Sequence, residues 1–222
     1  MGHLSDVRPR IRPVHGLLTA AALSAVTIVG LAASPAGAAT TCLGLTVTIQ
    51  GTAGADTITG TAGADVIAAG AGNDYVDGRD GNDRICGEGG NDNLLGFTGN
   101  DRIDGGDNDD SLLGEDGDDV IDGSGGTDSV SAGAGADTIS GGIGNDTVFG
   151  GPDNDVVLGG DGADGLRGND GNDILRGQAG TDSPQFGGAG ADDICGSPGE
   201  TLYGGATAFS PNDPGDVLTY TC

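Results

Sequence analysis

Aliphatic residues recur at every ninth position along most of the chain. The series runs unbroken from Ile58 to Leu175, and Pro184 stands in its next place. The neighbours of each aliphatic residue are mostly polar, as Thr57 and Thr59 are around Ile58. Because successive side chains of a strand point to opposite faces, the pattern predicts one short strand per nine residues, with one face buried and the other exposed to water.

Glycine and aspartate keep the same nine-residue period. An Asp precedes each aliphatic residue by two places, and Gly precedes each Asp by two places except at Asn108 and Asp153. Asn and Asp are the non-Gly residues that best tolerate a left-handed backbone, so both exceptions fit a left-handed position. The six Gly-rich residues between strands predict a turn, because Gly weakens both helices and strands.

A fixed period of this kind decides the fold class. Fifteen Asp follow one another at a spacing of nine, and a sixteenth unit at residues 187–194 follows one inserted residue near Phe186. Strand and turn alternating every nine residues fit an all-β coil with two strands per turn. Sixteen units then give 16/2 = 8 turns and a length of about 38 Å.

The predicted coil places carboxylates in rows. Stacked turns put Asp above Asp about 5 Å apart along each edge, so the edges repel unless a cation lies between successive loops. Small aliphatic side chains alone cannot offset the entropy lost in ordering so many Gly-rich residues. The sequence therefore predicts that folding is coupled to metal binding.

The available ligands indicate which metal. Carboxylates and abundant backbone carbonyls suit a hard cation, and flexible loops that offer six or more oxygens favour Ca²⁺ over Mg²⁺. Four widely spaced Cys do not form a zinc cluster, and both His lie near the amino terminus. An EF-hand needs a Glu at the twelfth loop position, and none of Glu88, Glu115 and Glu200 completes that pattern.

Charge limits the partners. The chain has 222 residues, 48 of them Gly, with 34 Asp plus Glu against 8 Lys plus Arg. Such an acidic chain is a poor partner for nucleic acid or an anionic membrane surface and a good one for cations.

The amino terminus has the features of a secretory signal. Arg8–Arg12 form a positive segment, Leu17–Ala33 an apolar one, and Ala36–Ala38 a small-residue cleavage site, which predicts cleavage after Ala38 and a secreted protein. The alternatives are an uncleaved membrane anchor and a lipid-anchored Cys42. After cleavage we expect no stable membrane insertion.

The four Cys fit an oxidising compartment. Three connectivities can be drawn, and free thiols are the alternative. We favour Cys42 with Cys86 and Cys195 with Cys222, because each bond would fasten an end cap onto nearby turns.

One nonapeptide carries a family resemblance. The segment 141–149, Gly-Gly-Ile-Gly-Asn-Asp-Thr-Val-Phe, resembles the GGxGxDxUx unit of RTX, or hemolysin-type, calcium-binding repeats. The resemblance covers about residues 51–204. It implies a parallel β-roll, a β-solenoid of about 16 repeats with short terminal caps, in which each Ca²⁺ lies between loops of adjacent turns. Residues 1–38 would then be the signal, 39–50 the amino-terminal cap and 205–222 the carboxyl-terminal cap.

The resemblance also implies the ligands. Each ion would be held by the motif Asp and loop carbonyls, and loops two repeats apart would share an ion, which allows at most 7 + 7 = 14 calcium sites. We expect the carboxyl-terminal turns to depart from the pattern, because Thr201 stands in the last Asp position. The expected ligands are Asp56, Asp65, Asp74, Asp83, Asp92, Asp101, Asp110, Asp119, Asp128, Asp137, Asp146, Asp155, Asp164 and Asp173, with Asp182 and Asp192 at the irregular end.

These features predict a secreted calcium-binding protein that is not an enzyme. A Ser-His-Asp or Cys-His arrangement needs a His that the mature chain lacks. Its role would be structural or interactive, with an unknown cell-surface or matrix partner. One alternative is an ice-binding roll, although its expected Thr ladder is broken after Thr52 and Thr61. The other is a carbohydrate-binding or adhesive surface, although the aromatic residues show no period.

Overall fold

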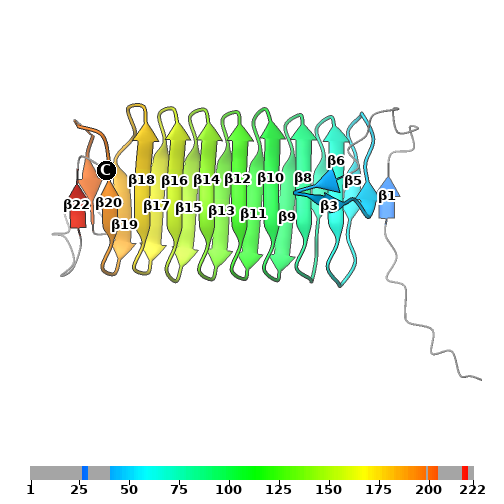
Figure 1. Ribbon diagram of the computed structural model, residues 1–222, viewed down its shortest axis with the longest axis horizontal. Coiled ribbons are helices and arrows are strands. Elements are labelled where there is room, and N and C mark those ends of the chain that lie inside the picture. The colour runs from blue at the N-terminus through cyan, green and yellow to red at the C-terminus, as the bar shows by residue number, and fades with distance from the viewer. Residues whose placement is uncertain (1–26, 30–40, 199, 205–216, 220–222) are drawn as a thin grey trace, which may run out of the picture.

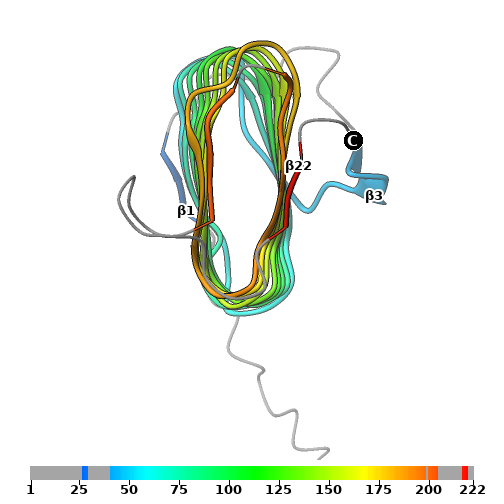
Figure 2. The same ribbon diagram turned by 90° about the vertical axis from the view of Figure 1, so that its left-hand side faces the viewer.

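The computed structural model describes residues 27–29, 41–198, 200–204 and 217–219. These residues form an elongated coil in which successive turns stack along one axis (Figure 1). Seen along that axis, the turns superimpose as flattened ovals with a sheet on each long side (Figure 2). Within the described residues, no helix is long and apolar enough to cross a membrane.

Alternate strands form two separate sheets, each of ten strands among the described residues. We call them the odd sheet and the even sheet. The odd sheet contains β1 (Thr27–Val29), β5 (Thr57–Thr59), β7 (Tyr75–Asp77), β9 (Asn93–Thr98), β11 (Ser111–Asp116), β13 (Ser129–Ala134), β15 (Thr147–Pro152), β17 (Gly165–Asp170), β19 (Gln185–Ala189) and β21 (Leu202–Tyr203). The even sheet contains β4 (Ile49–Gln50), β6 (Val66–Ala71), β8 (Arg84–Gly89), β10 (Arg102–Asp107), β12 (Val120–Gly125), β14 (Thr138–Ile143), β16 (Val156–Asp161), β18 (Ile174–Ala179), β20 (Asp193–Cys195) and β22 (Val217–Thr219).

Parallel pairing in a constant register confirms the predicted all-β solenoid. Residues 18 apart pair along the repeats, as Ile103 does with Ile121 in the even sheet and Leu94 with Leu112 in the odd sheet. The exception within the two sheets is β1, which pairs antiparallel with β5. The coil is slightly longer than the eight predicted turns, because Ile49 and Leu202 also bury their side chains in the core.

The core is a double stack of aliphatic side chains between the sheets. The inward residue of each repeat from Ile58 to Leu175 is at most 2% exposed. Alternation along the strand explains this burial, because the residues on either side of each inward position face outward. The predicted assignment of faces is confirmed.

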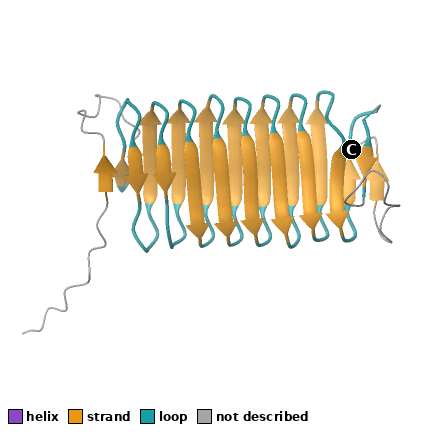
Figure 3. Cartoon of the chain, turned by 180° about the vertical axis from the view of Figure 1, so that it is seen from behind, coloured by secondary structure: helices purple, strands orange, loops and turns teal. Residues whose placement is uncertain are grey.

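The strands are longer than predicted. Most have six residues and continue through the Gly-rich segment, so that only short loops join the sheets (Figure 3). For example, the amide of Thr98 donates to the carbonyl of Arg79, beyond the expected triplet, at 3.0 Å. Stacking gives each backbone group a partner one turn away, and this pairing outweighs the low strand propensity of Gly.

The inserted residue corrects the expected core at the carboxyl-terminal end. Pro184 was expected in the inward position, but it is exposed, and Gln185 is fully buried there instead. The register changes from 18 to 19 residues at this point, since Arg167 pairs with Phe186. The insertion therefore lies before Phe186, and it moves the proline out of the core.

A small hairpin lies on the outside of the first turns. It consists of β2 (Thr41–Cys42) and β3 (Leu45–Thr46), which pair antiparallel. The predicted Cys42–Cys86 disulfide is confirmed and attaches the hairpin to β8. Cys195 is also disulfide-bonded, but its predicted partner Cys222 lies outside the described residues, as does most of the predicted signal at 1–38.

Candidate metal sites

The motif aspartates form two ladders along the edges of the coil. All sixteen are buried, with 0 to 8% of each residue exposed. In each ladder the backbone amide of one Asp donates to Oδ1 of the Asp one turn later, at 2.7 to 3.1 Å. One oxygen of each acceptor carboxylate thus holds the turns together. The structure brings the predicted residues into two rows of eight.

The second carboxylate oxygen has no protein partner through most of both ladders. These Oδ2 atoms are buried and accept no hydrogen bond. A buried carboxylate oxygen without a donor is costly, and metal coordination is one of the few ways to satisfy it. The Asp residues concerned include Asp74, Asp83, Asp92, Asp101, Asp110, Asp119, Asp128, Asp137, Asp146, Asp155, Asp164, Asp173 and Asp182.

The loops have the left-handed backbone expected from the sequence. Both non-Gly residues at the place two before Asp, Asn108 and Asp153, have a φ of 80°, which confirms the expectation. Glycine at this place also serves close packing. A Cβ at Gly99 would collide with the carbonyl oxygen of Gly81, one turn earlier.

Backbone oxygens lie beside the free carboxylate oxygens. A Cβ at Gly78 would lie 2.7 Å from Asp83 Oδ2 and 3.0 Å from the carbonyl oxygen of Gly96 on the next turn. Carboxylate and carbonyl oxygens are the donor set that Ca²⁺ prefers. No group of three or more His, Cys, Asp or Glu side chains that could hold a metal occurs in the described part of the chain. A cation here would therefore take much of its coordination shell from backbone carbonyls.

Comparison with known families agrees with this donor set. The family model of the RTX calcium-binding nonapeptide repeat, which spans four copies, matches residues 48–76, 59–94, 95–130, 122–157, 131–166 and 158–183. The chain belongs to the RTX calcium-binding repeat family. No curated protein matches it. The match covers most of the predicted repeats and identifies a calcium-binding repeat protein.

Burial raises the pKa of the RTX aspartates. It brings the pKa of Asp83, Asp92 and Asp119 to about 7, although the backbone hydrogen bond to each carboxylate opposes the shift. Neighbouring carboxylates of the same ladder raise these pKa values further. Without a cation, the RTX coil therefore favours protonated ladders, and a bound cation would replace those protons.

The amino-terminal end of the RTX array is closed by protein groups. Thr52 donates from its backbone amide and its hydroxyl to Asp56 Oδ2, at 2.6 and 2.8 Å. Thr61 makes the same pair of bonds to Asp65 Oδ2, at 2.6 and 2.9 Å. Asp56 retains a buried Oδ1 without a partner. These two loops thus satisfy the carboxylate oxygen that is free in the central repeats.

At the other end a glutamate replaces the expected residue. Thr201 was expected in the last Asp position, but Glu200 is buried there and its Oε1 accepts the amide of Asp182 at 3.2 Å. Oε2 of Glu200 accepts the amide of Ser197 at 2.7 Å. The insertion shifted the register by one residue, and the longer side chain of Glu still reaches the ladder.

Two features of the loops were not predicted. Asn or Asp immediately before the motif Asp forms a second, exposed ladder, as when Asn73 Oδ1 accepts the amide of Asn91 at 3.1 Å. The frequent Asn-Asp and Asp-Asp pairs of the sequence were a signal for it. In addition, non-Gly residues such as Arg79 and Phe97 have a left-handed backbone at φ 77°. No periodic signal marks these residues, because most repeats have Gly there.

Proposed function

We propose that this chain is a secreted structural or interaction protein whose RTX loops bind Ca²⁺ between adjacent turns and whose folding depends on extracellular calcium. The proposed ligands are the sixteen aspartates predicted from the sequence, together with loop carbonyls. An ion shared by loops one turn apart gives at most 14 sites.

The observation that carries the proposal is the row of buried Oδ2 atoms without a hydrogen-bond partner from Asp74 to Asp182. Ca²⁺ supplies the positive charge that these oxygens lack and has the flexible coordination that a repeating loop needs. The chain's own residues position the oxygens. The amide of each Asp fixes Oδ1 of the next carboxylate in the ladder, which leaves Oδ2 facing the loop.

Coupling to folding follows from the same charges. In the absence of cations, each ladder buries carboxylates above one another, which disfavours the charged coil at neutral pH. Any cation that binds the folded coil better than the unfolded chain shifts the equilibrium toward folding. Calcium concentration would thereby control whether the protein is folded.

Secretion is supported by the amino-terminal sequence and by the Cys42–Cys86 disulfide. Disulfides persist in oxidising compartments, where calcium is also plentiful. A chain that stays unfolded before export and folds outside would fit both features.

Far-ultraviolet circular dichroism of residues 39–222 during titration with Ca²⁺, with Mg²⁺ as control, tests the proposal. We expect a change from a coil to a β spectrum with Ca²⁺ alone. A β spectrum already complete in chelator would refute the coupling, and calorimetry showing no Ca²⁺ uptake would refute the sites themselves.

A further inference from the structure

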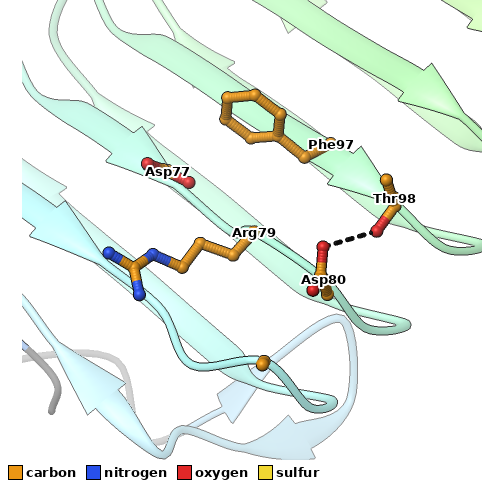
Figure 4. Close-up of a pocket in the computed structure, with 6 residues that line it drawn as sticks. Asp77, Arg79, Asp80, Phe97 and Thr98 are labelled. Atoms are coloured by element: carbon orange, nitrogen blue, oxygen red, sulfur yellow. Dashed lines mark hydrogen bonds between the residues drawn. The ribbon is translucent and has the colours of Figure 1, made fainter. Parts of the chain in front are cut away.

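A shallow pocket opens on the outside of the odd sheet, near its amino-terminal end (Figure 4). It has a volume of about 290 Å³, close to the lower limit of about 300 Å³ for small-molecule pockets. This volume suits a ligand of one or two small rings. Its walls come from successive turns and consist of Ala62, Asp77, Arg79, Asp80, Phe97 and Thr98.

The pocket lies where strand pairing stops early. The register between β5 and β7 ends at Thr59 opposite Asp77, whereas that between β9 and β11 continues through Thr98 opposite Asp116. Thr61 instead bonds to Asp65 within its own loop. Beside Arg79 the sheet therefore lacks the neighbouring strand that covers later turns.

Two side chains of the pocket occupy unfavourable backbone positions. Arg79 and Phe97 both have φ 77°, at a place in the repeat where Gly142, Gly151 and others supply the left-handed residue. A non-Gly residue there costs about 1 kcal/mol or more, and a bulky aromatic is a clear outlier. Strain retained in two adjacent turns is typical of functional sites.

The polar groups of the pocket are incompletely satisfied. Asp77 Oδ1 is buried without a hydrogen-bond partner, and it is the one such carboxylate oxygen outside the motif ladders among the described residues. The exposed Arg79 guanidinium forms no ion pair within that part of the chain. Thr98 Oγ1 donates to Asp80 Oδ1 at 2.9 Å and holds that carboxylate in place. In Figure 4, Asp77 lies between the Phe97 ring and the end of the Arg79 side chain.

We propose that this pocket binds a neutral sugar ring of a glycan. Sugar hydroxyls both donate and accept, so they match the donors of Arg79 and the acceptors of Asp77 and Asp80. The apolar C–H face of the ring would pack on Phe97. The net charge of −26 opposes anionic ligands, and Arg79 opposes cationic ones.

Affinity gel electrophoresis of the calcium-loaded chain tests the site, with dextran, xylan, glucomannan and hydroxyethylcellulose in the gels. We expect at least one of these neutral polysaccharides to retard the protein. Arg79→Gly and Phe97→Gly should each weaken retardation by about tenfold, the loss expected for one stacking or charged contact. Because Gly relieves the φ strain, both variants should fold at least as well as the parent.

Gln178→Gly is the matched control. Gln178 has the same left-handed backbone, at φ 74°, but lies on β18 in the even sheet, so its replacement should leave retardation unchanged. Equal retardation of the parent and both pocket variants would place sugar binding elsewhere and overturn the proposal. It would also be overturned if no neutral polysaccharide retards the parent, or if only polygalacturonate or oligolysine binds. Unchanged Ca²⁺ uptake would show that the repeats remain functional in any of these cases.

Discussion

The backbone amide of Asp101 donates to Oδ1 of Asp119, one turn further along the coil, at 2.7 Å. The other oxygen of the same carboxylate, Asp119 Oδ2, is buried without a partner. One side chain therefore has two separable roles. Oδ1 joins neighbouring turns, and Oδ2 provides a charge that needs a cation.

Asp119→Asn should separate these roles. The amide oxygen can still accept from Asp101, but the buried charge is lost. We expect the metal-free coil to gain about 1 to 3 kcal/mol in stability above pH 7, whereas the loaded protein should bind less Ca²⁺ by calorimetry. Asp118→Asn is the control, because Asp118 is exposed and its Oδ1 accepts the amide of Ala136 at 3.0 Å, a bond that Asn can keep. Equal effects of the two changes would contradict this assignment.

Acidification should stabilise the metal-free protein. Asp83, Asp92 and Asp155 have a pKa raised from 3.8 to about 7 in the folded chain, chiefly by burial. The folded state binds more protons than the unfolded state between these values, so the free energy of unfolding falls as pH rises from about 4 to 7. Circular dichroism in chelator should show more β signal at pH 5 than at pH 8. A β signal that instead grows with pH would show that these carboxylates are not buried as described.

Calcium affinity should change in the opposite direction. Protons and Ca²⁺ compete for the same oxygens, so the midpoint of the Ca²⁺ titration should move to higher concentration as pH falls below about 7. Titrations at several pH values measure this shift. A midpoint independent of pH would indicate that backbone carbonyls alone dominate binding.

Thr61→Val should loosen the first loops without regard to calcium. The change removes the hydroxyl that donates to Asp65 Oδ2 at 2.9 Å, at a cost of about 1 kcal/mol. Hydrogen exchange should accelerate at residues 60–65 equally in Ca²⁺ and in chelator. Thr57→Val is the control, since Thr57 is exposed on β5. If Ca²⁺ abolished the effect, the closure of this loop would depend on the cation.

Gly99→Ala should destabilise the loaded coil by about 2 to 4 kcal/mol. Gly99 has φ 130°, and an added methyl group would meet the Gly81 carbonyl oxygen. Gly54→Ala provides the contrast, because a Cβ at Gly54 meets no atom within 4 Å. Urea denaturation in Ca²⁺ compares the two variants, and equal midpoints would show that the loops can move apart to accept the methyl group.

The sequence alone determined the repeating part of this protein. A period of nine fixes which residue of each unit faces inward, because one wrong register would expose every aliphatic side chain. The same period places Asp in rows and the left-handed residues Asn108 and Asp153 in the loops. Each of these properties follows from local chemistry that is repeated many times.

The tertiary structure decided what happens where the repeat fails. A one-residue insertion placed Gln185 in the core and Glu200 in the ladder. It also concealed an aromatic row in which Phe186 stacks on Tyr203, with ring centroids 4.9 Å apart, and Arg167 lies over both Phe149 and Phe186. These contacts depend on the register between strands 17 to 19 residues apart, and the spacing along the chain does not reveal where that register changes. The pocket beside Arg79 and Phe97 has the same origin, because it forms only where one strand of a stacked pair ends early.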